Sequence, residues 1–382
     1  MPQGSPRLKA SPGSRLPGIH DQYACPKPAA AYRVAMRLRT VLATVTAGLA
    51  AATTLTAAGP ATAAQVTAAP ANACSPAVSI AGFSDALDKT TYEGTFVGNF
   101  SALAVDGKGE IAAVSDRSAL FTLDAKTLKT LAPTSVVPLA DENGAALDSE
   151  GLVVDRDGTR LVSSETEPSV RRYSRDGKIL DRLPVPDALK VAPAGRATAN
   201  QTFEGLTLLP GGRTLLAAME NSISGDTTGI VRFQTWDRHE GTFRLAAQYG
   251  YRTDPGLGVS ETTATPDGRV LVLERGFTAG VGNTVRLYLA DPRHATDTSS
   301  TATLTGQDGV RLVRKTLLAD LVNCPSLGAT AKQPQPNPLL DNIEGLTITG
   351  SAKGRLNLLL VSDDNQNPAQ ITRFYSLRAR LS

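Results

Sequence analysis

The stretch that decides the fold is "LDSEGLVVDRDGTRLVSSE", residues 147–165. Apolar and polar residues alternate on both sides of a turn at Asp157-Gly158, which predicts two β-strands joined as a hairpin. A glutamate stands beside apolar residues near the start of the first strand, Glu150, and another at the end of the second, Glu165. Burying a carboxylate is costly unless a partner compensates it, so these two positions need an explanation.

The same pattern recurs about every 50 residues, with one longer gap between Glu261 and Glu344. Each repeat has a short strand, a turn and an apolar strand that ends near an acid, and in four of the five a third strand carries an arginine before an aromatic residue or leucine. The aligned segments begin "FSALAVDGKG" at Phe100, "LDSEGLVVDRDG" at Leu147, "QTFEGLTLLPGG" at Gln201, "GVSETTATPDG" at Gly258 and "DNIEGLTITG" at Asp341. The arginines are Arg172, Arg232, Arg286 and Arg373.

Short strands repeated at this period, without a helical pattern, predict an all-β fold and a β-propeller of four-stranded blades. We count five blades, and six with one degenerate blade is the alternative. The last repeat is too short for a full blade. The segment "AVSIAGFSDALD", Ala77 to Asp88, is expected to supply the missing outer strand and close the ring. In an oxidising exterior Cys74 and Cys324 would form one disulfide, with free thiols as the alternative.

The N-terminal segment indicates export. From Met36 two arginines precede a small-residue and apolar run that ends in Ala61-Thr62-Ala63, as in a cleavable signal peptide at 36–63. A transmembrane helix or a lipid anchor at Cys74 is the weaker alternative. We expect residues 1–35 to be a disordered or untranslated extension, 64–76 a linker and 77–382 the propeller. The expected product is a secreted monomer that is not inserted in a membrane.

The charge and histidine content exclude several classes of function. Residues 1–63 hold seven basic and one acidic residue, so cleavage changes the formal net charge from +3 to −3 and removes the argument for a nucleic-acid partner. Only His239 and His294 remain after the leader, both in polar loop sequence. A Ser-His-Asp triad or a histidine-ligated metal is therefore not expected.

In a propeller, equivalent residues of successive blades lie around the central channel, so the repeated acids are expected to form a ring. The first strand of each blade lines the central channel and the second runs antiparallel to it, so the start of one and the end of the other meet at the same channel mouth. So many carboxylates would repel one another unless a cation or arginines compensate, and Ca²⁺ with oxygen ligands is the expected cation. Turn capping, or pairing with the third-strand arginines, is the alternative. The expected ligands are Glu150, Glu165, Glu204, Glu220, Glu261, Glu344 and Asp363.

Five sequence segments, in the order in which the family has them, resemble the phytase-like family, described as "esterase-like activity of phytase". They are "VSDRS…LFTLD", "DSEGLVVDRDGTRLVSSE", "FEGLTLLPGGRTLLAAMEN", "VLERGF" and "DNIEGLTI…LLLVSDDN", and the resemblance runs from about Phe83 to Leu377. It implies hydrolysis of phosphate or other esters of small molecules. The first repeat departs from the pattern, because Ser101 stands where other repeats have glutamate.

Together these observations predict a calcium-dependent ester hydrolase. Glu274 is expected to act as general base, with Arg117 and Arg275 steadying negative charge. Asp116, Asn221 and Asn365 are expected to contact the substrate, with Asn283 near the same strand ends. A calcium-dependent lactonase of the gluconolactonase-like kind and a non-catalytic extracellular binding propeller are the two alternatives.

Overall fold

The computed structural model describes residues 71–307 and 309–381. The expected extension at 1–35 and the expected signal peptide at 36–63 lie outside these residues. No helix within the described part of the chain is long and apolar enough to cross a membrane.

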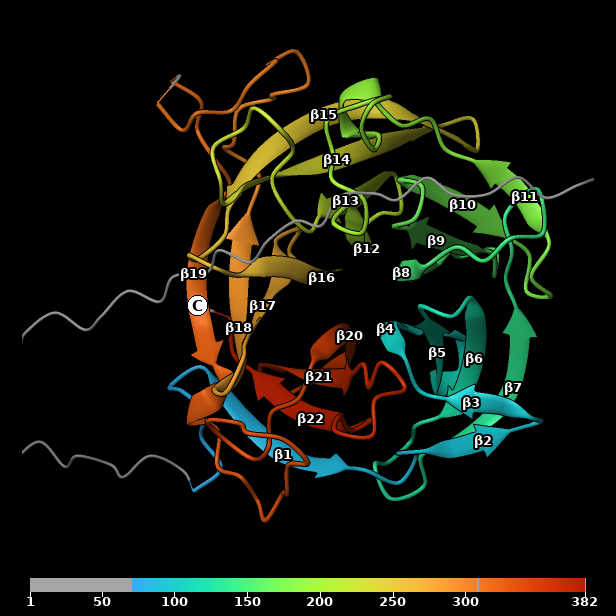
Figure 1. Ribbon diagram of the computed structural model, residues 1–382, viewed down its shortest axis with the longest axis vertical. Helices are drawn as coiled ribbons and strands as arrows, with labels where there is room; N and C mark the ends of the chain where they lie inside the picture. The colour runs from blue at the N-terminus through green and yellow to red at the C-terminus, as the bar shows by residue number, and fades with distance from the viewer. Residues whose placement is uncertain (1–70, 308, 382) are drawn as a thin grey trace, which may run out of the picture. The chain divides into compact units, whose positions relative to one another are not determined.

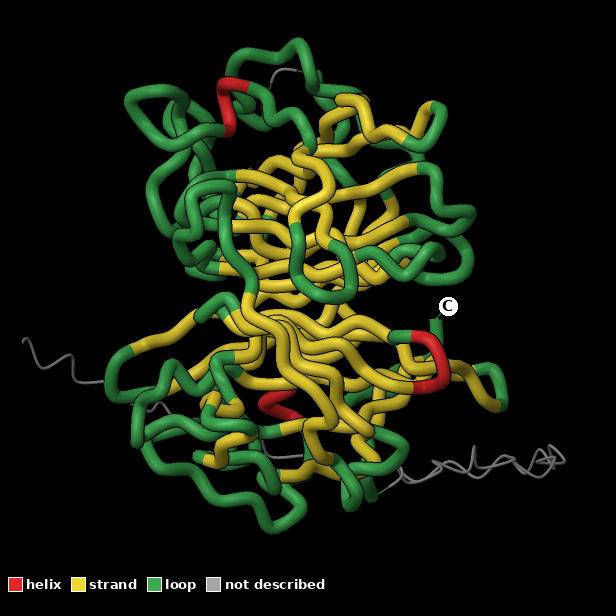
Figure 2. The backbone as a smooth tube through the Cα atoms, turned by 90° about the vertical axis from the view of Figure 1, so that its right-hand side faces the viewer, coloured by secondary structure: helices red, strands yellow, loops and turns green. Residues whose placement is uncertain are grey.

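Over the described residues the chain forms five antiparallel four-stranded sheets, which confirms the predicted all-β propeller of five blades. Their innermost strands surround a common centre (Figure 1), and neighbouring inner strands contact one another around the whole ring. Regular structure outside the strands is limited to short 3₁₀ turns, red in Figure 2. The short helical turns are η1 (Gly107–Gly109), η2 (Asp187–Leu189) and η3 (Leu321–Asn323).

From inner to outer strand, the first blade is β4 (Phe100–Val105), β5 (Glu110–Ser115), β6 (Ala119–Asp124) and β7 (Ala132–Pro138). The second is β8 (Ser149–Val154), β9 (Arg160–Ser164), β10 (Ser169–Tyr173) and β11 (Ile179–Arg182). The third is β12 (Phe203–Leu208), β13 (Thr214–Met219), β14 (Ile230–His239) and β15 (Thr242–Arg252). The fourth is β16 (Gly258–Ala264), β17 (Val270–Thr278), β18 (Gly282–Asp291) and β19 (Arg314–Asp320).

The fifth blade joins both ends of the described chain. It contains β20 (Ile343–Ala352), β21 (Arg355–Ser362), β22 (Phe374–Ala379) and, as its outer strand, β1 (Val78–Ser84). Strand β1 pairs antiparallel with β22, so the prediction that an N-terminal segment completes this blade is confirmed. The hairpin of β2 (Thr90–Tyr92) and β3 (Thr95–Val97) then leads into the first blade.

Apolar side chains between the sheets form the core. Phe100 of the first blade lies edge-on to Phe121 of the same blade, with ring centroids 5.5 Å apart, and to Phe374 of the fifth blade at 5.8 Å. All three rings are fully buried. This contact therefore packs the first blade against the last, where the ring closes.

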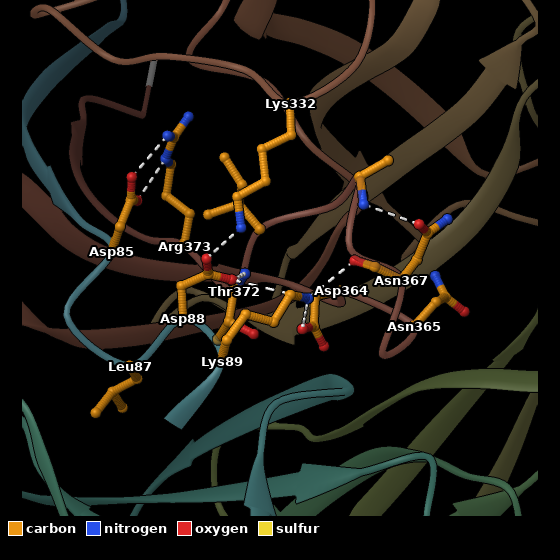
Figure 3. Close-up of polar contacts among 12 residues, drawn as sticks. Asp85, Leu87, Asp88, Lys89, Lys332, Asp364, Asn365, Asn367, Thr372 and Arg373 are labelled. Carbon is orange, nitrogen blue, oxygen red and sulfur yellow. Dashed lines mark hydrogen bonds and ion pairs between the residues drawn. The ribbon is translucent and has the colours of Figure 1, made fainter. Parts of the chain in front are cut away.

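Covalent and polar contacts reinforce the closure. Cys74, just before β1, forms a disulfide with Cys324, just after η3, as expected. Figure 3 shows the polar side of the joint, where the buried Arg373 donates through Nε to Asp85 at 2.6 Å. Lys89 forms an ion pair with the buried Asp364. The segment after β1 is thus fixed to the loop between β21 and β22.

Candidate functional site

A β-bulge interrupts the start of every inner strand. In the fifth blade Ile343 pairs with Ser362 and Gly345 with Val361, so Glu344 is an extra residue opposite no partner. The other four inner strands show a register shift at the same place. Bulges re-aim side chains and are frequent beside active sites. The residues at this bulge position, from the first blade to the fifth, are Ser101, Glu150, Glu204, Ser260 and Glu344.

A second set of equivalent residues follows the last paired residue of each second strand. The backbone N–H of Glu165 donates to the carbonyl of Asp148 at 2.9 Å, and the same bond joins Glu220 to Thr202 at 2.7 Å. The equivalent bonds of the first and fifth blades join Asp116 to Asn99 and Asp363 to Asn342. In the fourth blade Arg275 occupies this position, paired with Gly258. The set is therefore four acids and one arginine.

The charged residues of these two sets line one polar funnel of about 360 Å³, whereas Ser101 and Ser260 are not among its lining residues. Every described residue that lines it is charged or carries an amide. The lining residues are Asp116, Arg117, Asp148, Glu150, Glu165, Asn200, Glu204, Glu220, Arg275, Glu344, Asp363 and Asn365. Ten of these lining residues are among the predicted site residues, which the structure therefore brings together. Asp148 and Asn200 were not predicted.

In the fourth blade the predicted register is wrong by one residue. Val259 pairs with Glu274, as Ile343 pairs with Ser362, so the bulge residue is Ser260 and the strand-end residue is Arg275. Glu261 and Glu274 are each one position away from the funnel set. Because side chains alternate between faces along a strand, a slip of one residue places them elsewhere.

Glu261 and Glu274 both have structural partners. Oε1 of Glu261 accepts hydrogen bonds from the backbone N–H groups of Thr262 at 2.8 Å and Leu206 at 3.2 Å. The Glu274 carboxylate accepts from Tyr251 Oη at 2.6 Å, Lys315 Nζ at 2.5 Å and the Asp254 backbone N–H at 2.8 Å. Its contacts join the third and fourth blades rather than the funnel, so the structure does not place the expected general base at the mouth.

The acids of the second and third blades form two groups with the separation of a cation site. One oxygen each from Asp148, Glu150 and Glu165 lie within 4.8 Å of one another, and so do those of Glu165, Glu204 and Glu220. Glu204 is 3% exposed and its Oε2 is buried without a hydrogen-bond partner among the described residues. A buried carboxylate oxygen with no donor is an unusual cost, and a hard divalent cation would satisfy it. The donor set therefore fits Ca²⁺.

The fourth blade supplies a compensating cation. Nη2 of Arg275 lies 2.7 Å from Oε1 of Glu344 and 4.0 Å from Oε1 of Glu220, so this guanidinium connects the third, fourth and fifth blades. Asn342 Nδ2 donates to the same Glu344 oxygen at 2.9 Å. Arg117 is more exposed and lies 3.5 Å from the Asp116 carboxylate. The guanidinium of Arg275 therefore compensates Glu344 directly and also reaches Glu220, a member of the closely spaced acids.

Burial and crowding raise the carboxyl pKa values in the funnel. Burial raises the pKa of Asp116 to about 6. Burial, then the charge of Glu220, raises the pKa of Glu165 to about 8. The pKa of Glu204 is raised well above its ordinary value by burial and next by Glu150. Burial alone would lower the pKa of Arg275, but Glu344 first and then Glu204 raise it above the ordinary value. The funnel therefore favours a bound cation or protonated acids.

The arginines of the third strands do not neutralise the funnel. Arg232 donates to Asp226 at 2.6 Å, Arg286 to Asp320 at 2.9 Å and Arg373 to Asp85, while Arg172 pairs with Asp157. None of these partner acids is among the residues that line the funnel. The alternative in which the repeated arginines compensate the strand-end acids is therefore not what the structure shows.

The remaining predicted amides divide between the funnel and its surroundings. Asn365 lines the funnel, and its backbone N–H donates to Asp363 Oδ1 at 2.8 Å. Asn221 is not among the lining residues, but its Nδ2 donates to Glu220 Oε2 at 3.0 Å. The backbone N–H of the buried Asn283 donates to Gln335 Oε1 at 2.8 Å. Asn365 therefore borders the site directly, whereas Asn221 acts through Glu220.

Comparison with known proteins places the chain in a family. The family model described as "Phytase-like: Esterase-like activity of phytase" matches residues 95–366, so the chain belongs to the phytase-like family. A protein of Arthroderma benhamiae described as an "Uncharacterized secreted protein" is 28% identical. That match covers 35% of this chain and 35% of the fungal protein, so the chain spans about a third of the length of this curated relative.

Solved structures with a similar arrangement are distant. A gluconolactonase from Xanthomonas campestris is 15% identical with a TM-score of 0.37, covering 74% of this chain and 73% of that one. A protein of unknown function from Dyadobacter fermentans is 14% identical with a TM-score of 0.41, covering 80% and 100%. A PQQ-bound aldose sugar dehydrogenase from Streptomyces coelicolor is 12% identical with a TM-score of 0.37, covering 78% and 97%. Similarity at this level carries nothing about the chemistry of this chain.

Proposed function

We propose that this protein is a secreted hydrolase of small-molecule esters that depends on a divalent cation, most simply Ca²⁺. The observation that carries the proposal is the convergence of carboxylates on one funnel, where Glu204 Oε2 is buried without a partner. Membership of the phytase-like family supports ester hydrolysis as the reaction class. Secretion is supported by the description of the fungal relative and by the Cys74–Cys324 disulfide.

The cation would be held on the side of the second and third blades. Its ligands would be Asp148, Glu150, Glu165, Glu204 and Glu220, which supply the carboxylate oxygens of the two closely spaced groups. When bound, such a cation supplies polarisation of an ester oxygen and activation of water. The number of carboxylates suits a hard cation, because oxygen ligands at buried positions are what Ca²⁺ selects.

Two arginine side chains of the funnel would bind the negatively charged group of the ester. Arg275 and Arg117 are the two cations among the described residues of the funnel lining, and Arg275 lies 4.0 Å from Glu220, a member of the closely spaced acids. A guanidinium presents several N–H donors in a fixed plane and suits phosphate or carboxylate oxygens. Arg275, fixed by Glu344, would orient the substrate group, and the exposed Arg117 would close over it.

Asp116 is the best-placed proton acceptor in the funnel. It lines the cavity, lies outside the two closely spaced acid groups, and its Oδ1 has no hydrogen-bond partner among the described residues. Its pKa of about 6 leaves it ionised yet basic near neutral pH, as general base catalysis requires. Asp116 therefore replaces Glu274 as our candidate general base.

The test is metal analysis of the purified protein combined with an ester screen. We expect bound calcium and hydrolysis of one class among 4-nitrophenyl phosphate, 4-nitrophenyl acetate and sugar lactones, lost with chelator and restored by Ca²⁺. The Asp116→Asn variant should bind Ca²⁺ normally yet lose the acidic limb of the pH–rate profile near pH 6. Activity that survives complete metal removal would overturn cation dependence, and no turnover of any ester would favour a binding propeller.

A further inference from the structure

A second cavity of about 720 Å³ opens beside the funnel, between the third and fourth blades. Glu220 and Arg275 line both cavities, so the two adjoin at these residues. The volume lies within the range of small-molecule sites, roughly 300 to 1,000 Å³. We call this second cavity the blade 3–4 groove. A group bound in the funnel could extend into it without leaving the protein surface.

Two loops and the end of one strand build most of the blade 3–4 groove. The loop after β13 contributes residues 221–229 in part, and the connection from β15 to β16 contributes residues 253–257 in part. The last part of β17 contributes Gly276 and Phe277. Gly276 is required there, because a Cβ at this position would lie 2.7 Å from the Gly256 carbonyl oxygen. The groove floor is thus set by close backbone approach between blade connections.

The chemistry of the groove differs from that of the funnel. Among its described lining residues, two arginines, Arg252 and Arg275, face a single acid, Glu220. The funnel shows the reverse balance, with eight acids and two arginines among its described lining. Phe277 is 57% exposed and lines the groove together with Leu257. A groove lined by an exposed aromatic ring and by the exposed Arg252 suits a flat apolar group that carries negative charge.

We propose that the blade 3–4 groove binds the organic part of the ester and selects substrates whose flat apolar portion ends in an anionic group. The scissile ester would lie at the Glu220 and Arg275 junction, the apolar portion would pack on Phe277 and Leu257, and the anion would meet Arg252. This inference rests on the hydrolase function proposed above. It assigns Arg252 and Phe277 as specificity-determining residues.

The test measures binding of 2-naphthoate and its neutral analogue 2-naphthamide to the calcium-loaded full chain by titration calorimetry. We expect Arg252→Met to weaken 2-naphthoate about fivefold and to leave 2-naphthamide unchanged, since a partly exposed ion pair contributes on the order of 1 kcal/mol. Phe277→Ser should weaken both probes. Arg244→Met and Leu245→Ser are matched controls, because both residues are exposed on β15 and neither lines the groove.

The outcomes separate this proposal from the hydrolase proposal. If the wild type binds neither probe, or if Arg252→Met and Phe277→Ser bind 2-naphthoate as the wild type does, the groove proposal is overturned even when cation-dependent ester hydrolysis is present. If binding depends on Arg252 and Phe277 but no ester is hydrolysed, the hydrolase proposal fails and the groove stands as a ligand site. With an active parent, Arg252→Met should raise KM for an anionic aryl ester and leave kcat unchanged.

Discussion

Arg275 of the fourth blade donates to Glu344 of the fifth at 2.7 Å, from a position where the other four blades carry an acid. Without this exception the strand ends would present five acids to one funnel. The guanidinium also lies 4.0 Å from Glu220, so it links the carboxylates of two blades on either side of its own. We infer that Arg275 offsets part of the negative charge of the funnel and so makes the acid-rich lining compatible with a folded ring.

The first prediction concerns this guanidinium. Arg275→Met keeps most of the side-chain length and removes the charge, so the free energy of unfolding in chelator at pH 8 should fall by about 3 kcal/mol, as for other broken buried ion pairs. At pH 5 the loss should be smaller, because burial raises the pKa values of Glu344 and Glu220 and fewer of these carboxyl groups are then ionised. Arg117→Met is the control, since its side chain is 63% exposed. Equal losses at both pH values would contradict the compensating role. Urea unfolding at the two pH values measures it.

The second prediction is a pH dependence that the cation removes. The folded-state pKa values are raised, to about 6 for Asp116 and about 8 for Glu165, so the folded protein retains protons that the unfolded chain releases. Their contribution to stability is fully present below the ordinary carboxyl pKa, near 4, and is lost as the pH rises through the folded-state values. In chelator the free energy of unfolding should therefore fall between about pH 4 and pH 8.

Calcium should flatten this decline, because a bound cation stabilises the ionised acids. At a calcium concentration 100 times the dissociation constant, the gain at pH 8 should be about 2.7 kcal/mol, with a correspondingly higher Tm. Magnesium, which demands a smaller octahedral site, is the comparison ion. A stability profile that is flat in chelator, or unchanged by calcium, would argue against a crowded, cation-binding funnel.

The third prediction compares the same substitution at two buried glutamates. Glu274→Gln should lower the free energy of unfolding by about 3 kcal/mol, because it removes the negative charge paired with Lys315 and one of the two oxygens that accept hydrogen bonds from Tyr251, Lys315 and the Asp254 backbone. It should leave calcium affinity unchanged. Glu204→Gln should weaken calcium binding at least tenfold and should not destabilise the calcium-free protein at pH 8, since it removes a crowded charge. Thermal unfolding and calcium titration distinguish the two. If Glu274→Gln abolished turnover without loss of stability, the base role expected from the sequence would return to Glu274.

The contrast between these glutamates shows what the sequence could reveal. Repeat spacing and alternation were sufficient to predict the five blades, the N-terminal closing strand and most of the funnel acids. They gave the wrong residues in the fourth blade. Aligning Glu261 and Glu274 with the glutamates of the other repeats matches the residue type but shifts both strands by one position. Only the pairing of Val259 with Glu274 reveals Ser260 and Arg275 as the equivalent residues. Because successive side chains of a strand point to opposite faces, a register shift of one residue exchanges the side chains that face the site with those that face away.

Asp148 and the groove were missed for a different reason. Asp148 precedes its strand with φ of 53°, a left-handed conformation in which its side-chain direction does not follow strand alternation. One signal was present, because Asp148 and Asn342 both stand two residues before a funnel glutamate. The groove residues lie between 201 and 277, on connections whose proximity depends on how two blades pack. Local sequence patterns do not encode that proximity.

The fourth prediction concerns the close contact between the Gly258 backbone and the Glu220 side chain, where the two cavities adjoin. Gly258 faces Glu220, and a Cβ there would lie 3.1 Å from Glu220 Cγ and 3.3 Å from Oε1. Gly258→Ala should therefore displace the Glu220 carboxylate by a few tenths of an ångström and weaken calcium binding several-fold at a stability cost of about 1 kcal/mol or less. Gly107→Ala is the matched control, since its Cβ would meet nothing within 4 Å. Calcium titration and urea unfolding of both variants measure the effect. Unchanged calcium affinity in Gly258→Ala would remove Glu220 from the cation ligands, and an equal change in Gly107→Ala would show that the effect does not arise at this contact.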